Sequence, residues 1–473
     1  MFDVKTHSKT VLKQSVFGHF LQRDDITCAY NALKIETIFF KTGLYSHITS
    51  VIGKPVEEAL AQVPDGLRSA FESVLTKICN AHILVPAAYD ELSYLKQVQK
   101  MAFHGPSLRV LVLHMTDYCN LRCRYCFIEG GMSKEYVRRD MSKETARASI
   151  DKFVAVISGR SLPKYPSVVF YGGEPLANWS VVEDTLEYIA QKQAEKILPE
   201  RVDKILITNG TLVSPSIAAT LKKFGVKVSV SVDGPKDVHD AQRITCAQRG
   251  SHEATITGFR LLESAGIQPT VSCVLSKDSL KKGSEIIRYL LDELGVKALG
   301  FNHVSIVPNV NDYDPLYEAD FGQTIIAVQE IIQADYPAVY ERRMNHKLNS
   351  FLSRQIIRAD CTGCGEQMSV SPDGKIGICQ GYMGSRKTFA GDVTDPKYFP
   401  GNDPVFIEWS HRSPLTTEAC YDCPALATCG GGCPRNADVI NGSIWKVDSA
   451  FCHFAKQAQE WMIWKKYDLE RRE

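Results

Sequence analysis

Three closely spaced cysteines have the clearest chemical potential in this sequence. Cys119, Cys123 and Cys126 lie in the segment CNLRCRYC, with the spacing C-x3-C-x2-C. A 4Fe-4S cluster usually takes four thiolates, so a compact set of three leaves one iron without a local protein ligand. An open iron can bind a substrate. Three free thiols on a loop, or half of a zinc site, are the alternatives.

A second group of cysteines lies in the C-terminal part of the chain. Its spacing is C-x2-C, then G-x4-C, a gap, C-x2-C-x5-C-x3-C, another gap and a last cysteine. Eight thiols could fill two sites of four thiolates, although paired C-x2-C knuckles are also typical of zinc ribbons. The eight are Cys361, Cys364, Cys379, Cys420, Cys423, Cys429, Cys433 and Cys452. Cys28, Cys79, Cys246 and Cys273 lack partner spacing, and we assign them no role.

Three polar turns follow β-rich runs of the sequence. Paired glycines let the backbone approach a ligand closely, and a glutamate can receive an ammonium group. Each turn taken alone could equally be ordinary turn chemistry. The turns are Gly172-Gly173-Glu174-Pro175, Thr208-Asn209-Gly210, and Ser231-Val232-Asp233-Gly234-Pro235 with Arg243 downstream.

The elements that must position these residues alternate regularly. Between residues 105 and 310, β-rich runs and amphipathic helices form six β/α units. This pattern predicts an α/β fold in which a parallel sheet curves round on itself as a partial (β/α)6 TIM-like barrel. Turns that directly follow strands lie at the C-terminal rim, where barrel enzymes keep their chemistry.

The flanking segments predict further units. Residues 1–100 read as a small α+β domain, with a strand over 32–40 and helical periodicity over 56–84. Residues 311–360 read as a helical linker. Residues 361–473 read as a loop-rich domain that ends in a helix, and metal would supply part of its stability.

Composition limits the function classes. The 473 residues carry 55 basic and 54 acidic side chains, a formal charge of +1, and no charge block that indicates binding to nucleic acid or an anionic membrane. No apolar run approaches the roughly 20 residues that span a bilayer, and a secretory signal is absent, so we expect a cytoplasmic protein. Fifteen cysteines are better explained there by metal than by disulfides.

The triad and the turns together resemble the radical S-adenosylmethionine (SAM) superfamily, whose signature has an aromatic residue before the third cysteine, here Tyr125. The resemblance implies that the open iron of a 4Fe-4S cluster chelates SAM. An electron from the cluster then yields a 5′-deoxyadenosyl radical, which abstracts a hydrogen. The implied SAM contacts are Gly172, Gly173 and Glu174 for the amino group, Ser231 and Arg243 for the carboxylate, and Asn209 for the methionine or ribose.

The second cysteine group resembles the SPASM domain, a C-terminal extension of radical SAM enzymes. The resemblance implies two auxiliary 4Fe-4S clusters, three clusters in all. Cys361, Cys364, Cys379 and Cys433 would hold the first, and Cys420, Cys423, Cys429 and Cys452 the second. Whether Cys361 and Cys364 both ligate stays open, since both lie at permitted distances from Gly374.

SPASM enzymes are mostly maturases of ribosomally made peptides. The resemblance therefore implies a precursor peptide with a leader as substrate, and a reductant such as flavodoxin or ferredoxin. Residues 1–100 look like the small domain that binds a leader as an added strand, although they could merely cap the barrel.

The reaction type is the least determined part of this interpretation. Sulfatase maturases carry an Asp after the cysteine equivalent to Cys379, but here Gln380 follows, and an amide cannot serve as a general base. We therefore favour an oxidoreductase that crosslinks a peptide, with a thioether preferred and a carbon–carbon bond possible. Sulfatase-type maturation and peptide epimerisation are alternatives. An iron-sulfur electron carrier and a zinc-stabilised peptide-binding adaptor are alternatives of another class. The sequence identifies no general acid or base.

Overall fold

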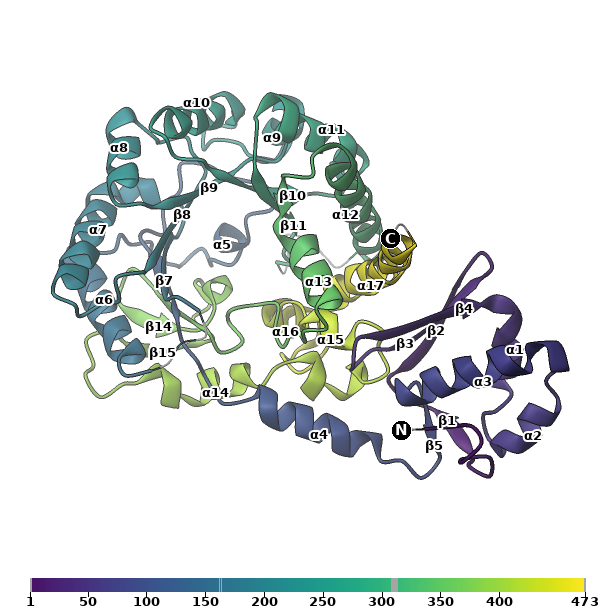
Figure 1. Cartoon of the computed structure of the whole chain (residues 1–473). Helices are drawn as coiled ribbons and strands as arrows, with labels where there is room; N and C mark the ends of the chain where they lie inside the picture. Colours follow the sequence, from purple (N-terminus) through teal and green to yellow (C-terminus); the bar gives the residue numbers. More distant parts are fainter. Residues whose placement is uncertain (1, 161, 163, 308–313, 472–473) are drawn as a thin grey trace.

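A computed structural model describes residues 2–160, 162, 164–307 and 314–471. Its centre is a curved parallel sheet with helices on the outside, which confirms the predicted α/β partial barrel (Figure 1). The six strands are β6 (Val110–His114), β7 (Ser167–Tyr171), β8 (Asp203–Thr208), β9 (Lys227–Ser231), β10 (Thr270–Leu275) and β11 (Ala298–His303). The outer helices are α6 (Lys143–Ile157), α7 (Trp179–Ala194), α8 (Pro215–Lys223), α9 (Lys236–Gln242), α10 (His252–Ser264) and α11 (Gly283–Arg288).

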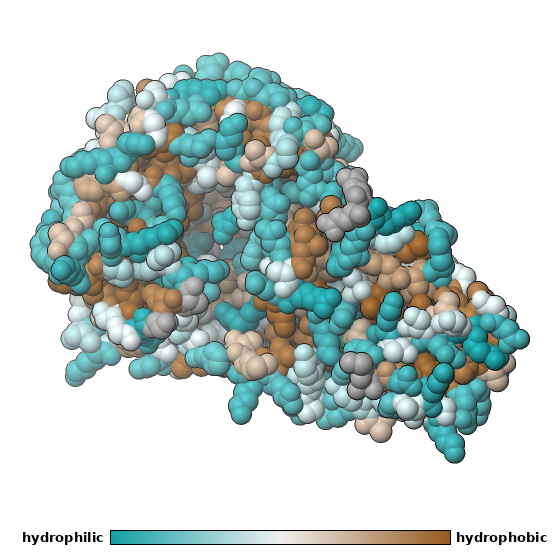
Figure 2. All heavy atoms as spheres, in the orientation of Figure 1, coloured by the Kyte–Doolittle hydropathy of each residue, from teal (hydrophilic) through white to brown (hydrophobic). Residues whose placement is uncertain are grey.

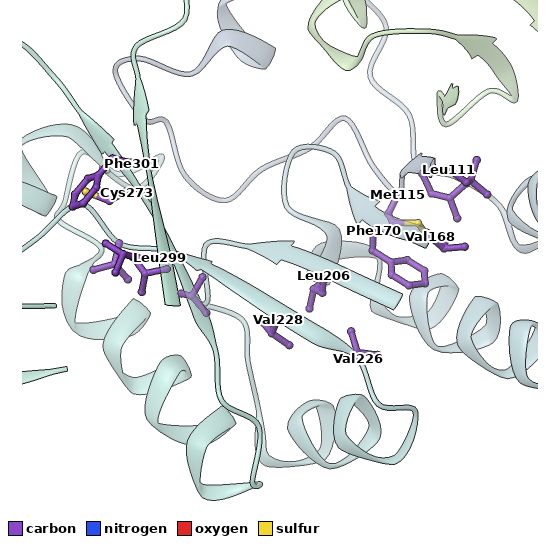
Figure 3. Close-up of a cluster of buried hydrophobic side chains, with 14 of the residues drawn as sticks. Leu111, Met115, Val168, Phe170, Leu206, Val226, Val228, Cys273, Leu299 and Phe301 are labelled. Atoms are coloured by element: carbon purple, nitrogen blue, oxygen red, sulfur yellow. The ribbon is translucent and has the colours of Figure 1, made fainter. Parts of the chain in front are cut away.

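Side chains alternate between the two faces of this sheet. Residues such as Leu111, Phe170 and Leu206 point outward and are fully buried against the helices (Figure 3). Their neighbours along the strands point inward, and those of β7 to β11 are mostly half-buried. The interior of the barrel is therefore accessible, and Figure 2 shows the molecule hollowed there.

The sheet does not close between its first and sixth strands. The strand order is β12-β11-β10-β9-β8-β7-β6-β13-β14-β15, so the C-terminal region extends the barrel beyond β6. Here β13 (Gln367–Val370) runs parallel to β6, and β14 (Lys375–Gly377) and β15 (Phe389–Asp392) continue antiparallel. The sequence predicted loops for this region. The strands were missed because they have four residues or fewer, too short to show a period.

Residues between the barrel and the second cysteine group are largely helical. They form α12 (Pro315–Asp335), the short strand β12 (Tyr340–Glu341) and α13 (Arg342–Leu352). The strand β12 pairs with β11, while α12 packs against α11 and the C-terminal helix α17 (Ser449–Glu470).

The N-terminal region contains a three-stranded antiparallel sheet and short helices. Its elements are β1 (Leu12–Gln14), β2 (Gly18–Arg23), β3 (Ile26–Asn31), β4 (Glu36–Lys41), α1 (Tyr45–Thr49), α2 (Val56–Ala61), α3 (Asp65–Asn80), β5 (Leu84–Pro86) and α4 (Glu91–Ala102). The strand predicted over 32–40 is wrong for 32–35, which form a turn with Ile35 at φ 53°. The helical prediction over 56–84 is interrupted near Pro64, which precedes α3, and ends before β5.

This N-terminal region shares a hydrophobic core with the C-terminal helices. Phe39 of β4 contacts Trp464 and Tyr467 of α17, with ring centroids 6.3 and 5.0 Å apart. Tyr30 of β3 lies 6.2 Å from Phe351 of α13. The two ends of the chain are therefore packed together, next to the barrel (Figure 1).

The rest of the C-terminal region consists of short helices and turns. The longer ones are α14 (Pro404–Ser410), α15 (Leu426–Cys429) and α16 (Pro434–Asn441), and two 3-10 turns are η5 (Gln380–Tyr382) and η8 (Glu418–Cys420). Among the described residues, no helix is both long and apolar enough to cross a membrane.

Candidate functional site

The three cysteines of the first motif form a nest between β6 and α5 (Phe127–Gly130), the short helix inside the ring of strands (Figure 1). Backbone amides donate to two of the sulfurs, Leu121 N to Cys119 Sγ and Glu129 N to Cys126 Sγ, both at 3.4 Å. Burial raises the pKa of Cys119 to about 12 and that of Cys123 to about 11, and the neighbouring sulfurs contribute in the same direction. Iron binds thiolates, so it would displace these protons on binding.

The glycine pair after β7 lies directly against the nest. A Cβ on Gly173 would lie 2.1 Å from the Tyr118 carbonyl oxygen, and one on Gly172, at φ 135°, would lie 2.5 Å from the Thr116 oxygen. Any side chain at either position would push β7 away from the cysteine loop. The two glycines are thus required by the close approach of the two segments.

Glu174 connects its own Gly-Gly-Glu-Pro turn to the Thr208-Asn209-Gly210 turn. Its carboxylate is buried and accepts hydrogen bonds from Thr208 Oγ1 at 2.7 Å and Asn209 N at 2.8 Å. The Asn209 amide in turn donates to Asn120 Oδ1 at 3.0 Å and lies 3.9 Å from Cys119 Sγ. Both carboxylate oxygens are engaged, so Glu174 fixes the Thr-Asn-Gly turn beside the nest.

The turn after β9, together with Arg243 downstream of it, supplies a buried ion pair. Arg243 Nε donates to Asp233 Oδ2 at 2.9 Å, and Nη1 lies 4.0 Å from Cys123 Sγ. The Tyr125 hydroxyl donates to the same Asp233 oxygen. Ser231 points inward from β9 and is half-buried. The structure therefore gathers Tyr125, Asn209, Ser231 and Arg243 at the C-terminal rim of the strands.

The eight C-terminal cysteines separate into two groups of four. The pKa of Cys361 is raised well above its usual range by burial and then by Cys364, Cys433 and Cys379, which are therefore its neighbours. Burial raises the pKa of Cys452 to about 12, and its neighbouring sulfurs are Cys429, Cys420 and Cys423. We call these the first quartet (Cys361, Cys364, Cys379, Cys433) and the second quartet (Cys420, Cys423, Cys429, Cys452).

Three consecutive glycines form the turn that connects the two quartets. Gly430, Gly431 and Gly432 have φ values of 75°, 83° and 63°, a run that L side chains strongly disfavour. The run separates Cys429 of the second quartet from Cys433 of the first. Gly431 N donates to Cys429 Sγ at 3.3 Å, so the turn also stabilises a sulfur.

A buried lysine lies between the quartets. Lys347 of α13 is 1% exposed, and its ammonium donates to the carbonyl oxygens of Cys429 at 2.8 Å and Thr428 at 3.1 Å. It also lies 3.4 Å from the carboxylate of Asp360, which directly precedes Cys361. One cation therefore holds the segments that carry both quartets.

The barrel segment matches a known family. Residues 113–290 fit the family model of the Radical SAM superfamily. The chain contains a radical SAM domain. The match begins in β6 and includes the nest and the three polar turns.

Two curated proteins are similar to about three quarters of the chain. The radical SAM cyclopropyl synthase TigE of Paramaledivibacter caminithermalis is 26% identical over 376 residues, which cover 74% of this chain and 73% of TigE. A cysteine-type anaerobic sulfatase-maturating enzyme of Clostridium perfringens is 24% identical over 378 residues, 75% of this chain and 96% of that enzyme.

Solved radical SAM structures share the fold. The native sulfatase-maturating enzyme anSMEcpe with bound AdoMet and Cp18Cys peptide has a TM-score of 0.65 and 22% identity, covering 78% of this chain and 100% of that one. Streptococcus suis SuiB bound to its precursor peptide SuiA has a TM-score of 0.54 and 15% identity, covering 93% of this chain and 99% of SuiB.

The residues around the nest fit the cofactors of a radical SAM domain. Three half-buried cysteines, two of whose sulfurs accept backbone N–H groups, suit a 4Fe-4S cluster with one open iron. The glycine pair lets β7 lie against the cysteine loop, and Ser231 presents a hydroxyl to the accessible interior. The donor set is therefore appropriate for SAM.

Several residues of the site carry no recognisable sequence signal. Lys347 lies on an ordinary amphipathic helix, and Gln367 becomes part of the interior only because β13 pairs with β6. Tyr171 directly precedes the glycine pair, which could have marked it as inward-facing. Lys347 and Gln367 could not be identified from sequence, because each depends on contacts between distant segments.

Proposed function

We propose that this radical SAM enzyme is a peptide maturase that removes hydrogen from a ribosomally made peptide and installs a crosslink. The observation that carries the proposal is the convergence of two sulfur sites on one interior. Tyr171 points inward from β7, and burial raises its pKa, with Cys126 of the nest and Cys379 of the first quartet both acting in the same direction. Sulfurs of both sites therefore lie near one hydroxyl.

We also propose that the C-terminal region is a SPASM domain and that each quartet holds an auxiliary 4Fe-4S cluster. Support comes from the separation of eight thiols into two groups of four. Cys361 and Cys364 both belong to the first quartet, because each has Cys433 as a neighbouring sulfur. Both are therefore assigned as ligands.

The chain's own residues would have defined tasks in this reaction. When bound, the nest cluster and SAM supply the carbon-centred radical that takes a hydrogen atom from the peptide. Ser231 and Arg243 would bind the SAM carboxylate, Asn209 would face the methionine or ribose, and Gly172, Gly173 and Glu174 would hold the amino group. The half-buried inward face of the strands would hold the peptide.

The bond that forms is proposed from Gln380 and from the relatives. Gln380 provides no general base where sulfatase maturases have an aspartate, which argues against oxidation of a peptide Cys or Ser to an aldehyde. A thioether from a peptide cysteine is the lead, and the similarity to a cyclopropyl synthase makes a carbon–carbon bond the second candidate.

Mass spectrometry of any small peptide encoded beside this chain, after coexpression, tests the proposal. A loss of two hydrogens is expected, because one would leave as a hydrogen atom to the 5′-deoxyadenosyl radical and the other as a proton, with its electron accepted by an auxiliary cluster. A thioether would consume a cysteine that iodoacetamide labels in the unmodified peptide, whereas a carbon–carbon bond would leave that thiol reactive. An unchanged mass with solvent deuterium uptake would mean epimerisation instead. Reduced enzyme that forms no 5′-deoxyadenosine from SAM would behave as an electron carrier, and the proposal would fail.

Metal analysis tests the cluster assignment. Three 4Fe-4S clusters require about twelve irons per chain after anaerobic purification. A Cys126→Ala variant should lose roughly four of them together with SAM cleavage. Zinc with little iron would favour the adaptor alternative.

We propose that the N-terminal region binds the leader as an added strand. β2 and β4 are the outer strands of its sheet, and neither has a second strand partner among the described residues. β4 lies beside α3, so a peptide along β4 could contact that helix as well. Amide hydrogen exchange with and without the peptide tests this: slowed exchange in β4 or β2 is expected, and unchanged exchange in both would exclude strand addition.

A further inference from the structure

Gln380 lies where the nest, the first quartet and the barrel interior meet. It follows Cys379 directly and begins η5, which packs against α5, the helix that starts after Cys126. Its side chain is half-buried rather than enclosed. A group at this place is close to both sulfur sites.

The Gln380 carboxamide is held in one orientation by Gln367. Gln367 Nε2 donates to Gln380 Oε1 at 2.8 Å and to the Ile378 carbonyl oxygen at 3.0 Å. Gln367 is itself fixed, because its Oε1 accepts from Thr362 Oγ1 at 2.8 Å. The oxygen of Gln380 is therefore occupied, while its Nε2 has no hydrogen-bond partner among the described residues.

The pair lies on the interior side of the sheet. Met368 and Val370 of β13 belong to the core that faces the helices, so Gln367 and Ser369, which alternate with them along the strand, face inward. Tyr171 faces the same interior from β7, with Cys379 near its hydroxyl. The free N–H groups of Gln380 thus border the interior that Tyr171 lines.

We infer that Gln380 is a substrate-positioning residue whose N–H groups donate to a carbonyl oxygen of the peptide segment that is modified. The inference rests on the proposed function. A carboxamide offers two donors, whereas a carboxylate at this position only accepts and would repel a carbonyl oxygen. Gln367 strengthens the preference of this site for a carbonyl oxygen. Because Gln367 donates to the Gln380 oxygen, it disfavours the flipped carboxamide in which that oxygen would face the peptide.

Gln380→Glu separates this role from a structural one. The glutamate keeps an oxygen to accept from Gln367, so a merely structural role would survive, but it loses both donors. With the peptide encoded beside this chain as the probe, we expect the KM to rise and kcat/KM to fall about tenfold or more, the worth of one hydrogen bond. Gln380→Leu, which also loses the contact to Gln367, should show a similar fall. Wild-type KM in the Gln380→Glu variant would overturn the inference.

Gln268→Glu is the matched control, because this exposed residue precedes β10 and receives the same charge change. It should keep wild-type KM. Iron content, measured for every variant, shows that the clusters are intact. If the wild-type enzyme leaves the peptide mass unchanged, the proposed function itself fails. If the wild type modifies the peptide and Gln380→Glu does so with the same KM, only the role of Gln380 fails.

Discussion

At the scale of single residues, the interior of this enzyme contains polar groups that its hydrogen bonds do not fully satisfy. His114 ends β6 on the inward face and is 1% exposed, yet neither ring nitrogen has a partner among the described residues. Its ring contacts Tyr171 edge-on, with centroids 5.6 Å apart. Burial, and then the charge of Arg386, lowers the pKa of His114 to about 3. The folded chain therefore keeps this imidazole neutral.

This neutral histidine predicts acid sensitivity. Its folded pKa of about 3 lies below the unfolded value of 6.5, so the unfolded chain binds the extra proton as pH falls through 6.5. Stability from this group is present above pH 6.5 and is lost towards pH 3. His114→Leu should flatten that dependence and, by removing two unpaired nitrogens, raise stability at pH 7 by about 1 kcal/mol. Urea midpoints at pH 5 and pH 7 check both effects; an equally steep pH dependence in the variant would contradict the assignment.

Lys347 illustrates the opposite case, a buried charge whose partners are all present. Lys347→Met roughly keeps the length of the side chain but removes its charge. Asp360 then has Arg343, 3.5 Å away, as its remaining cationic partner. The carbonyl oxygens of Thr428 and Cys429 at the end of α15 lose their hydrogen-bond donor. Loss of one member of a buried ion pair costs about 3–5 kcal/mol. We expect a lower thermal midpoint and weaker iron retention. The exposed Lys281→Met serves as control and should change neither.

At the scale of elements, the sequence predicted the helices and strands that have a clear hydrophobic period, and it missed strands of four residues or fewer. Six β/α units and the helix around Phe454 were predictable because each shows a clear period. β13 was not, because four residues in a cysteine-rich segment show no pattern, and its pairing with β6 joins residues far apart in sequence. The separation of cysteines into quartets followed from the family resemblance, whereas Lys347 and the Gln367–Gln380 contact needed the three-dimensional structure.

The glycine run between the quartets gives an element-scale prediction. A Cβ on Gly430 would lie 2.6 Å from the backbone nitrogen of Asp360, at φ 75°. Gly430→Ala should therefore displace Cys429 from Cys433 and reduce iron by up to eight atoms, two clusters' worth, with the four of the nest retained. Gly442, also at φ 75° but with open space around it, is the matched control. Gly442→Ala should keep its iron, so equal iron in both variants would show that the turn does not organise the quartets.

At the scale of the whole molecule, the N-terminal region is packed against the cysteine-rich C-terminal region through a shared core. Arg23 of β2 pairs with Asp468 and lies over the Trp464 ring, 4.7 Å from its centroid, while Phe39 packs on the same ring. Tyr30 packs near Cys423, one of its electrostatic neighbours. A leader bound to this sheet would therefore be held at a fixed place relative to the barrel, and removal of residues 1–100 would expose the shared core.

Trp464→Ala tests this anchoring without removing the region. Truncating a buried tryptophan typically lowers the free energy of unfolding by about 3–5 kcal/mol. Here the substitution would weaken the contact of β2 and β4 with α17. We expect faster proteolysis of residues 18–41 and weaker modification of the peptide encoded beside the chain, while 5′-deoxyadenosine formation without peptide persists because the nest lies in the barrel. Trp445→Ala, at a half-exposed residue bonded to Glu408, is the control and should leave all three unchanged. Full peptide modification by the Trp464 variant would mean that a fixed N-terminal region is unnecessary for presenting the substrate.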